Sequence, residues 1–290
     1  MIKIIGIAVV FICVFGGYLM AGGHIAALWQ PSEMLIILGA AAGSTMLGNS
    51  KEVLIEMKHQ LKQVFATKKK VEDGEGDLCR ELLTLMHHLL DEVRLKGIKA
   101  LDEHIEAPSQ SSVFLCYPTV AEENPLILTF VTDNFRLISM GKISPHDLDT
   151  QLEGEIDMIM EEKLKPAHAL HRTGEACPGF GILAAVGGII ITMGHLDGPL
   201  ASIGLHVAAA LVGTFIGIFM CYCLLEPASS AMEELVMKEV NLLQCIRAIM
   251  IAHIRGKQPL LAVDAGRKTL EPDMKPSFTI MEEWVTNRAM

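Results

Sequence analysis

The stretch that decides the fold runs from Glu175 to Pro227 and reads EACPGFGILAAVGGIIITMGHLDGPLASIGLHVAAALVGTFIGIFMCYCLLEP. Within it, residues 176–195 and 198–225 contain no Asp, Glu, Lys or Arg. Crossing a hydrocarbon core about 30 Å thick takes about 20 helical residues, so each run is long enough for one span. A helix is the form in which a single open segment satisfies its own backbone in lipid. The stretch therefore predicts a transmembrane helical hairpin.

Small residues spaced four apart fill this hairpin, with Gly213 and Gly217 in the second run and several glycines in the first. Small residues allow helix backbones to approach closely, so we expect the hairpin to pack against other helices. Each predicted helix also carries a proline near one end, Pro178 and Pro227.

A second hairpin is predicted at the N-terminus, with spans at Ile4–Met20 and Met34–Leu47. A cleaved signal peptide would resemble the first run, but another apolar run follows it directly, which favours a retained span. Lys and Arg cluster after the second span, before the third and after the fourth, whereas both short links lack them. By the positive-inside rule, both termini and the long middle loop face the cytoplasm.

The predicted fold class is therefore all-α: a four-span helical membrane protein with a helical cytoplasmic domain built from the loop between spans two and three and the C-terminal tail. Four segments follow: hairpin 1–50, cytoplasmic domain 51–175, hairpin 176–227, and cytoplasmic extension and tail 228–290. In the cytoplasmic domain, the charged stretch 68–77 reads as a hinge, and apolar residues at helical spacing predict helices over 78–93 and 126–140. A further helix starting after Ser144 is expected to end at Leu164, before Pro166. Beyond Pro227 the helical period continues to Gly256, and a shorter helix is expected near Leu260–Leu270.

Composition excludes several classes of function. The net charge of −10 argues against a nucleic-acid-binding protein, which would need a basic surface. Seven cysteines without a C-x-x-C pair point to reduced thiols and not to a metal site, and no metal or cofactor is expected. No nucleophile–base pair or phosphate-binding loop is present, so an enzyme is not predicted.

The predicted spans contain no acidic or basic residue, and His206 is the titratable group well inside one of them. His206 fits a proton relay or a hydrogen-bonded histidine near the outer interface. Intramembrane carboxylates usually mark proton pathways. If the chain belongs to an ion-driven machine, we therefore expect another subunit to supply the proton-binding carboxylate.

The segment ALVGTFIGIF at 210–219, followed after seven residues by Pro227, resembles the signature of the MotA family, the A-type membrane subunits of the flagellar motor stator. The likeness extends to GGYLMAGG at 16–23, QPSE at 30–33, RLKG at 94–97, AGRKTL at 265–270 and KPSF at 275–278. The resemblance implies a pentameric ring around a MotB-like single-span partner in the bacterial inner membrane. Proton flow through that complex would turn the flagellar rotor.

The resemblance also implies roles for single residues. Pro178 and Pro227 would shape a conformational element beside the partner's carboxylate, although prolines near the ends of spans are also common without a role. Thr214 would line the ion path, or simply bond to its own helix. Glu175 would collect or release the ion, or be a solvated acid at the membrane edge. Ala185 stands where sodium-driven relatives carry threonine, which favours the proton.

Arg94 matches the arginine that the family presents to the rotor protein FliG, and Asp102 stands where the best-known members have glutamate. From composition alone, so charged a segment would be read as a solvated helix face. The main alternative function is an ExbB/TolQ-like proton-driven energiser of outer-membrane processes, against which the extra N-terminal hairpin argues. An autonomous channel or transporter would need charged or broken helices at the membrane midplane.

Overall fold

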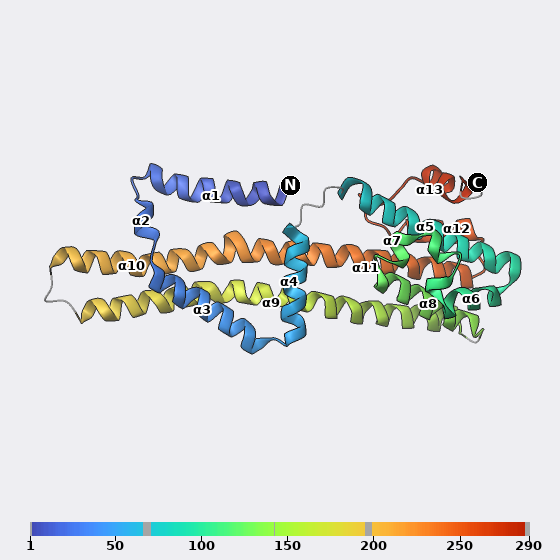
Figure 1. Ribbon diagram of the computed structural model, residues 1–290, viewed down its shortest axis with the longest axis horizontal. Coiled ribbons are helices and arrows are strands. Elements are labelled where there is room, and N and C mark those ends of the chain that lie inside the picture. Colours follow the sequence, from blue (N-terminus) through green and yellow to red (C-terminus); the bar gives the residue numbers. More distant parts are fainter. Residues whose placement is uncertain (1, 66–70, 142, 195–198, 288–290) are drawn as a thin grey trace. The chain divides into compact units, whose positions relative to one another are not determined.

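The computed structural model describes residues 2–65, 71–141, 143–194 and 199–287, and within these ranges the regular structure is entirely helical (Figure 1). The predicted all-α fold class is therefore confirmed. The chain divides into two compact units. The first unit comprises Met1–Thr67 and Lys163–Leu235, and the second comprises Lys68–Glu162 and Val236–Met290. The predicted four-segment division relative to the membrane stays a prediction.

The first unit holds the apolar helices. These are α1 (Ile2–Met20), α2 (Ile25–Leu28), α3 (Pro31–Gly48), α4 (Lys51–Phe65), α10 (Leu200–Phe219), and the adjoining parts of α9 (Pro145–Met193) and α11 (Glu226–Ile254). A π-helical turn, η4 (Met220–Leu225), joins α10 to α11. Within this unit α3 packs on α10, and aromatic rings of α1 contact Phe219.

Three helices among the described residues are long and apolar enough to cross a membrane. They contain Lys3–Met20, Pro145–Met193 and Ile203–Ile254. The α3 helix, which covers the predicted second span, is not one of these three, so the count of four spans stays a prediction. Its 18 residues include Pro31 and Glu33 in the first turn.

The prediction that the helix beginning after Ser144 ends at Leu164, separate from the third predicted span, is wrong, because both belong to α9. It continues without interruption through Pro166 and Pro178. An internal proline removes one backbone hydrogen bond and often kinks a helix, but it does not have to end it. Contacts from other segments hold the helix around Pro166: the Ser229 hydroxyl donates to the Ala167 carbonyl at 2.9 Å, and Gln60 Nε2 donates to the Lys163 carbonyl at 3.0 Å.

The second unit is a helical bundle. Its elements are α5 (Val71–Lys96), η1 (Ile98–Leu101), α6 (Asp102–Glu106), η2 (Pro108–Gln110), η3 (Phe114–Cys116), α7 (Pro118–Ala121), α8 (Pro125–Ser139), α12 (Pro259–Arg267) and α13 (Phe278–Thr286), with the adjoining parts of α9 and α11. The predicted apolar face of α5 lies in its core, as do Phe130 and Phe135 of α8.

The predicted hinge at 68–77 is only partly testable, because Lys68, Lys69 and Lys70 lie outside the described residues. The remainder of that stretch is not a hinge, since α5 begins at Val71. Helix α5 continues past the predicted end at residue 93 to Lys96 and stops before Gly97, whose φ is 86°. The predicted helix end at Gly256 is confirmed, and that glycine has a φ of 79°.

Candidate functional site

The backbones of α9 and α10 touch along a seam of glycines in the first unit. A Cβ placed on Gly181 would lie 2.7 Å from the Gly213 carbonyl oxygen, and one on Gly217 would lie 2.6 Å from the Cys177 carbonyl oxygen. Only glycine fits at such distances, which explains the small residues of the sequence. The hairpin therefore packs tightly on itself.

The two prolines expected in the ion path lie near one contact of this seam. Pro178 frees the carbonyl of Gly174, and Gly174 packs against Leu225 and Glu226, immediately before Pro227. Cys177, Cys221 and Ala41 of α3 form a small apolar cluster at the same place. Pro178 follows Gly174 by four residues on α9, and Pro227 directly follows Glu226, so each proline lies on one side of this contact.

The π-helical turn η4 ends two residues before Pro227. At its end, the Glu226 N–H donates to the Cys221 carbonyl, five residues earlier. A π turn inside an α-helix is uncommon and often marks a functional site. The π turn thus places a local irregularity in the helix next to the proline that removes a backbone donor.

The other expected ion-path residues lie on the same two helices. Thr214 packs beside Gly181, since a Cβ on that glycine would lie 3.2 Å from the Thr214 Cα. Ala185 is half-buried. Glu175 is exposed, and its Oε1 lies 3.6 Å from His171 Nε2.

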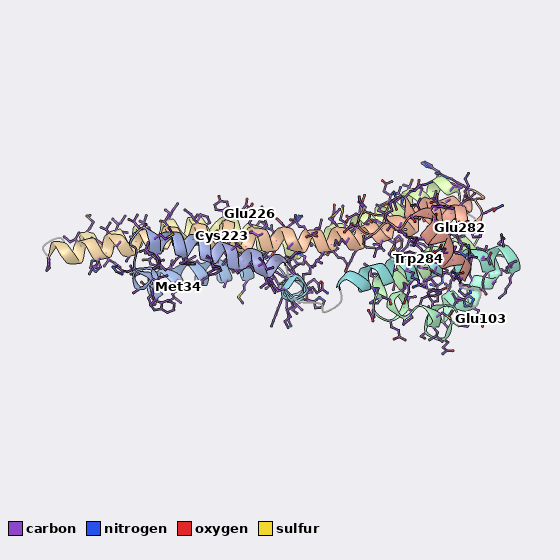
Figure 2. The ribbon with its side chains drawn as sticks, turned by 90° about the horizontal axis from the view of Figure 1, so that it is seen from above. Met34, Glu103, Cys223, Glu226, Glu282 and Trp284 are labelled. Carbon is purple, nitrogen blue, oxygen red and sulfur yellow. The ribbon has the colours of Figure 1, made fainter. Side chains whose placement is uncertain are left out.

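Glu33 is a residue that the sequence analysis missed. The predicted second span begins at Met34 and therefore leaves Glu33 outside it. In the structure α3 begins at Pro31, and the Glu33 side chain is buried. The available signal was Pro31, because proline is common at the first position of a helix. Figure 2 labels the next residue, Met34, on α3 in the first unit.

The two residues expected to face a rotor lie at the end of α5 and the start of α6 in the second unit. Both are exposed. Arg94 pairs with Asp91 at 3.0 Å, and Asp102 accepts a hydrogen bond from the Ser139 hydroxyl at 3.0 Å. Neither contributes to the core, which leaves both charges accessible.

A buried clasp fixes the spacing of these two residues. Glu92, two residues before Arg94, bonds to Nε2 of His104, two residues after Asp102, at 2.8 Å. The other histidine nitrogen lies 2.8 Å from the Ser111 hydroxyl, and that oxygen accepts the backbone N–H groups of Val113 and Phe114. Burial alone would raise the pKa of Glu92, but bonds from Lys96 and His104 outweigh it and lower that pKa.

The motifs near the C-terminus have a structural explanation. Asp264 is buried and its carboxylate pairs with Arg267 and Lys268 of the AGRKTL motif, each at 2.7 Å. Arg267 also donates to the Pro276 carbonyl in KPSF at 2.9 Å. Gly266 lies so close to α11 that a Cβ would be 2.7 Å from the Cys245 carbonyl oxygen. These motifs hold α12 and the tail in place. Among the described residues there is no group of three or more His, Cys, Asp or Glu that could hold a metal ion.

Comparisons with known proteins agree with this architecture. Residues 4–97 match the motility protein A N-terminal family, and residues 122–245 match the MotA/TolQ/ExbB proton channel family. The chain is 53% identical to "Chemotaxis protein LafT" of Vibrio parahaemolyticus over 99% of both chains. It is 34% identical to "Motility protein A" of Escherichia coli, covering 98% of this chain and 95% of that one.

Two solved structures share the fold. The Campylobacter jejuni MotAB structure matches with a TM-score of 0.71 at 22% identity, covering 93% of this chain and 95% of that one. The Bacillus subtilis flagellar MotAB stator complex matches with a TM-score of 0.67 at 20% identity, covering 90% and 92%. The chain is thus a helical membrane subunit of the proton channel class. Within that class it belongs to the MotA family, the A-type stator subunits of the flagellar motor, and not to the ExbB/TolQ alternative.

Proposed function

We propose that copies of this chain form a pentameric ring around a MotB-like single-span partner, and that proton flow through this complex turns the flagellar rotor. The observation that carries the proposal is the tightly packed pair α9 and α10, whose described residues 176–194 and 199–225 contain no Asp, Glu, Lys or Arg. A proton path along these helices needs a carboxylate from elsewhere. The partner supplies it, and the activity is transport coupled to movement and not catalysis.

The seam contact between Gly174 and Leu225–Glu226 supports a conformational role for Pro178 and Pro227. Proline and the π turn leave backbone groups there with few fixed partners, so small shifts cost little. Thr214 lines the path, Glu175 exchanges the ion with water, and Ala185 leaves no hydroxyl that would help dehydrate sodium. The proton is therefore the coupling ion.

The second unit lies in the cytoplasm with both termini, as the distribution of Lys and Arg indicates. Arg94 and Asp102 face FliG of the rotor. Their exposure and the Glu92–His104 clasp support this assignment, because a docking surface needs accessible charges at a defined spacing.

The test is charge reversal at Arg94. Arg94→Glu is expected to impair swimming without lowering the amount of chain in the membrane, because like charges at a docking surface repel. Lys99→Glu is the matched control, since Lys99 is also exposed and lies on η1 between the two sites. It should impair swimming less.

A charge reversal at the facing position of FliG should restore part of the motility lost in Arg94→Glu. If no rotor reversal compensates, or if Lys99→Glu is equally harmful, the rotor-facing assignment is wrong. Loss of Arg94→Glu from the membrane would show that Arg94 is structural.

A further inference from the structure

Glu33 is a buried acid that the proposed function does not use. Glu33 is 5% exposed and lies in the first turn of α3. Its Oε2 atom is fully buried and has no hydrogen-bond partner among the described residues. A buried polar atom without a partner is rare in folded proteins and calls for an explanation.

The carboxyl group occupies a notch made by glycines of two other helices. A Cβ on Gly213 of α10 would lie 2.5 Å from Glu33 Oε2, and a Cβ on Gly188 of α9 would lie 3.7 Å from Oε1. Ala210 and Ala184 complete the walls, because the same two hypothetical Cβ atoms would lie 3.1 Å and 3.3 Å from their methyl groups. The notch therefore has room for a carboxyl group but offers it an apolar lining.

The elements around the notch bring no charge to balance a carboxylate. On α9, Thr192 lies one turn beyond Gly188 and donates its hydroxyl to the Gly188 carbonyl at 2.8 Å. On α10 the titratable group one turn before Ala210 is His206, and α2, which also packs on α10, consists of Ile, Ala, Ala and Leu. Described residues 176–194 and 199–225 contain no Lys or Arg.

We propose that Glu33 is a proton-binding site of this chain: neutral when seated in the Gly188–Gly213 notch, and driven out of it when it ionises. An isolated ionised carboxylate in an apolar site is so unfavourable that the group takes up a proton instead. A metal ion such as Ca²⁺ or Mg²⁺ would require about six oxygen ligands, and the glycine and alanine side chains that line the notch carry no oxygen. The proton is the one cation that fits.

Protonation of Glu33 is thereby coupled to the packing of α3 on α9 and α10. The neutral form seals the seam, and the ionised form has to reach water, so α3 acts as a proton-dependent latch. This site belongs to the A-type chain itself and is additional to the carboxylate expected from the partner. It does not depend on the rotor contact or on the ring.

Infrared spectroscopy of the full chain in complex with its single-span partner tests the site directly. The partner's membrane acid is first replaced by its amide, so that it adds no signal. The wild-type chain at neutral pH should show the carbonyl stretch of a protonated carboxylic acid, shifted in heavy water, and Glu33→Gln should lose it. Glu103→Gln is the control, because Glu103 is exposed in the second unit and should leave the band unchanged (Figure 2).

Gly213→Ala provides a second variant that keeps the carboxyl group. Its new methyl group would meet the flexible end of Glu33, which can swing away, so the chain should assemble while the band weakens or disappears. Gly204→Ala on the same helix meets nothing within 4 Å and should leave the band intact. A band that persists in both Glu33→Gln and Gly213→Ala, or is absent from the wild type, overturns the proposal.

Discussion

The two units of this chain bury acidic side chains in opposite ways. In the second unit Asp264 is 7% exposed, and Arg267 and Lys268 lie within one turn of it on the same chain segment. In the first unit Glu33 is equally buried, but no described cation approaches it. Burial alone would raise the pKa of Asp264, yet the bonds and charges of Lys268 and Arg267 outweigh it and lower that pKa. An equally buried acid is thus structural in one unit and a candidate for proton exchange in the other.

The largest expected effect is the difference in stability between amide substitutions of these two acids. Asp264→Asn should cost about 3 kcal/mol of unfolding free energy, because it leaves the buried Arg267 without its carboxylate. Glu33→Gln should cost little, because an amide has the shape of the neutral acid. For Asp264→Asn, the unfolding free energy is measured by urea unfolding followed by Trp284 fluorescence in a Trp29→Phe background. For Glu33→Gln, the stability is measured as survival of the purified complex on heating.

Asp273→Asn is the matched control for Asp264, since Asp273 is exposed and lies 3.8 Å from Lys238. Exposed pairs contribute about 0.2–1 kcal/mol, so this change should be small. If Glu33→Gln proved as damaging as Asp264→Asn, Glu33 would have an ionic partner and the contrast between the units would fail.

A smaller effect is expected from the glycine seam of the first unit. Gly217→Ala places a methyl group against the backbone carbonyl of Cys177, which cannot swing aside, and overpacking of this kind costs about 1–3 kcal/mol. Gly179→Ala on α9 meets nothing within 4 Å and should be neutral or slightly stabilising. Loss of the complex on heating, followed by size-exclusion chromatography, compares the two variants. Equal behaviour would show that the seam is looser than the structure indicates.

The smallest effect concerns the clasp of the second unit. Because the pKa of Glu92 is lowered from its ordinary value of 4.5, its carboxylate stabilises the fold above that pH, and this contribution is lost as the pH falls through the lowered pKa. Glu92→Gln should therefore cost about 1 kcal/mol at neutral pH and progressively less in acid. Urea unfolding at a series of pH values measures the difference, with Glu103→Gln as the exposed control. If the loss of unfolding free energy caused by Glu92→Gln grew as the pH fell, Glu92 would not stabilise the fold as a carboxylate.

Sequence reasoning found the elements with strong local signals. Charge-free runs located α1, α10 and the membrane part of α9, and Gly256 marked a helix end because a positive φ favours glycine. It misjudged Pro166 and the stretch after Lys70, because a proline or a glycine weakens a helix without having to end it. Around Pro166 contacts from other segments hold the helix. Those contacts, such as Ser229 to the Ala167 carbonyl, join residues far apart in the chain.

The sequence by itself determined that this chain is a helical membrane protein of the MotA family, because hydropathy, glycine spacing and motif residues are local properties. Only the tertiary structure decided which residues meet: Gly174 with Leu225 and Glu226, Glu92 with His104, and Glu33 with two glycines about 155 and 180 positions further along. A buried acid is costly or stable according to what lies beside it, and that neighbourhood is assembled from distant segments. The physical role of Glu33 therefore depends on packing and not on its position in the sequence.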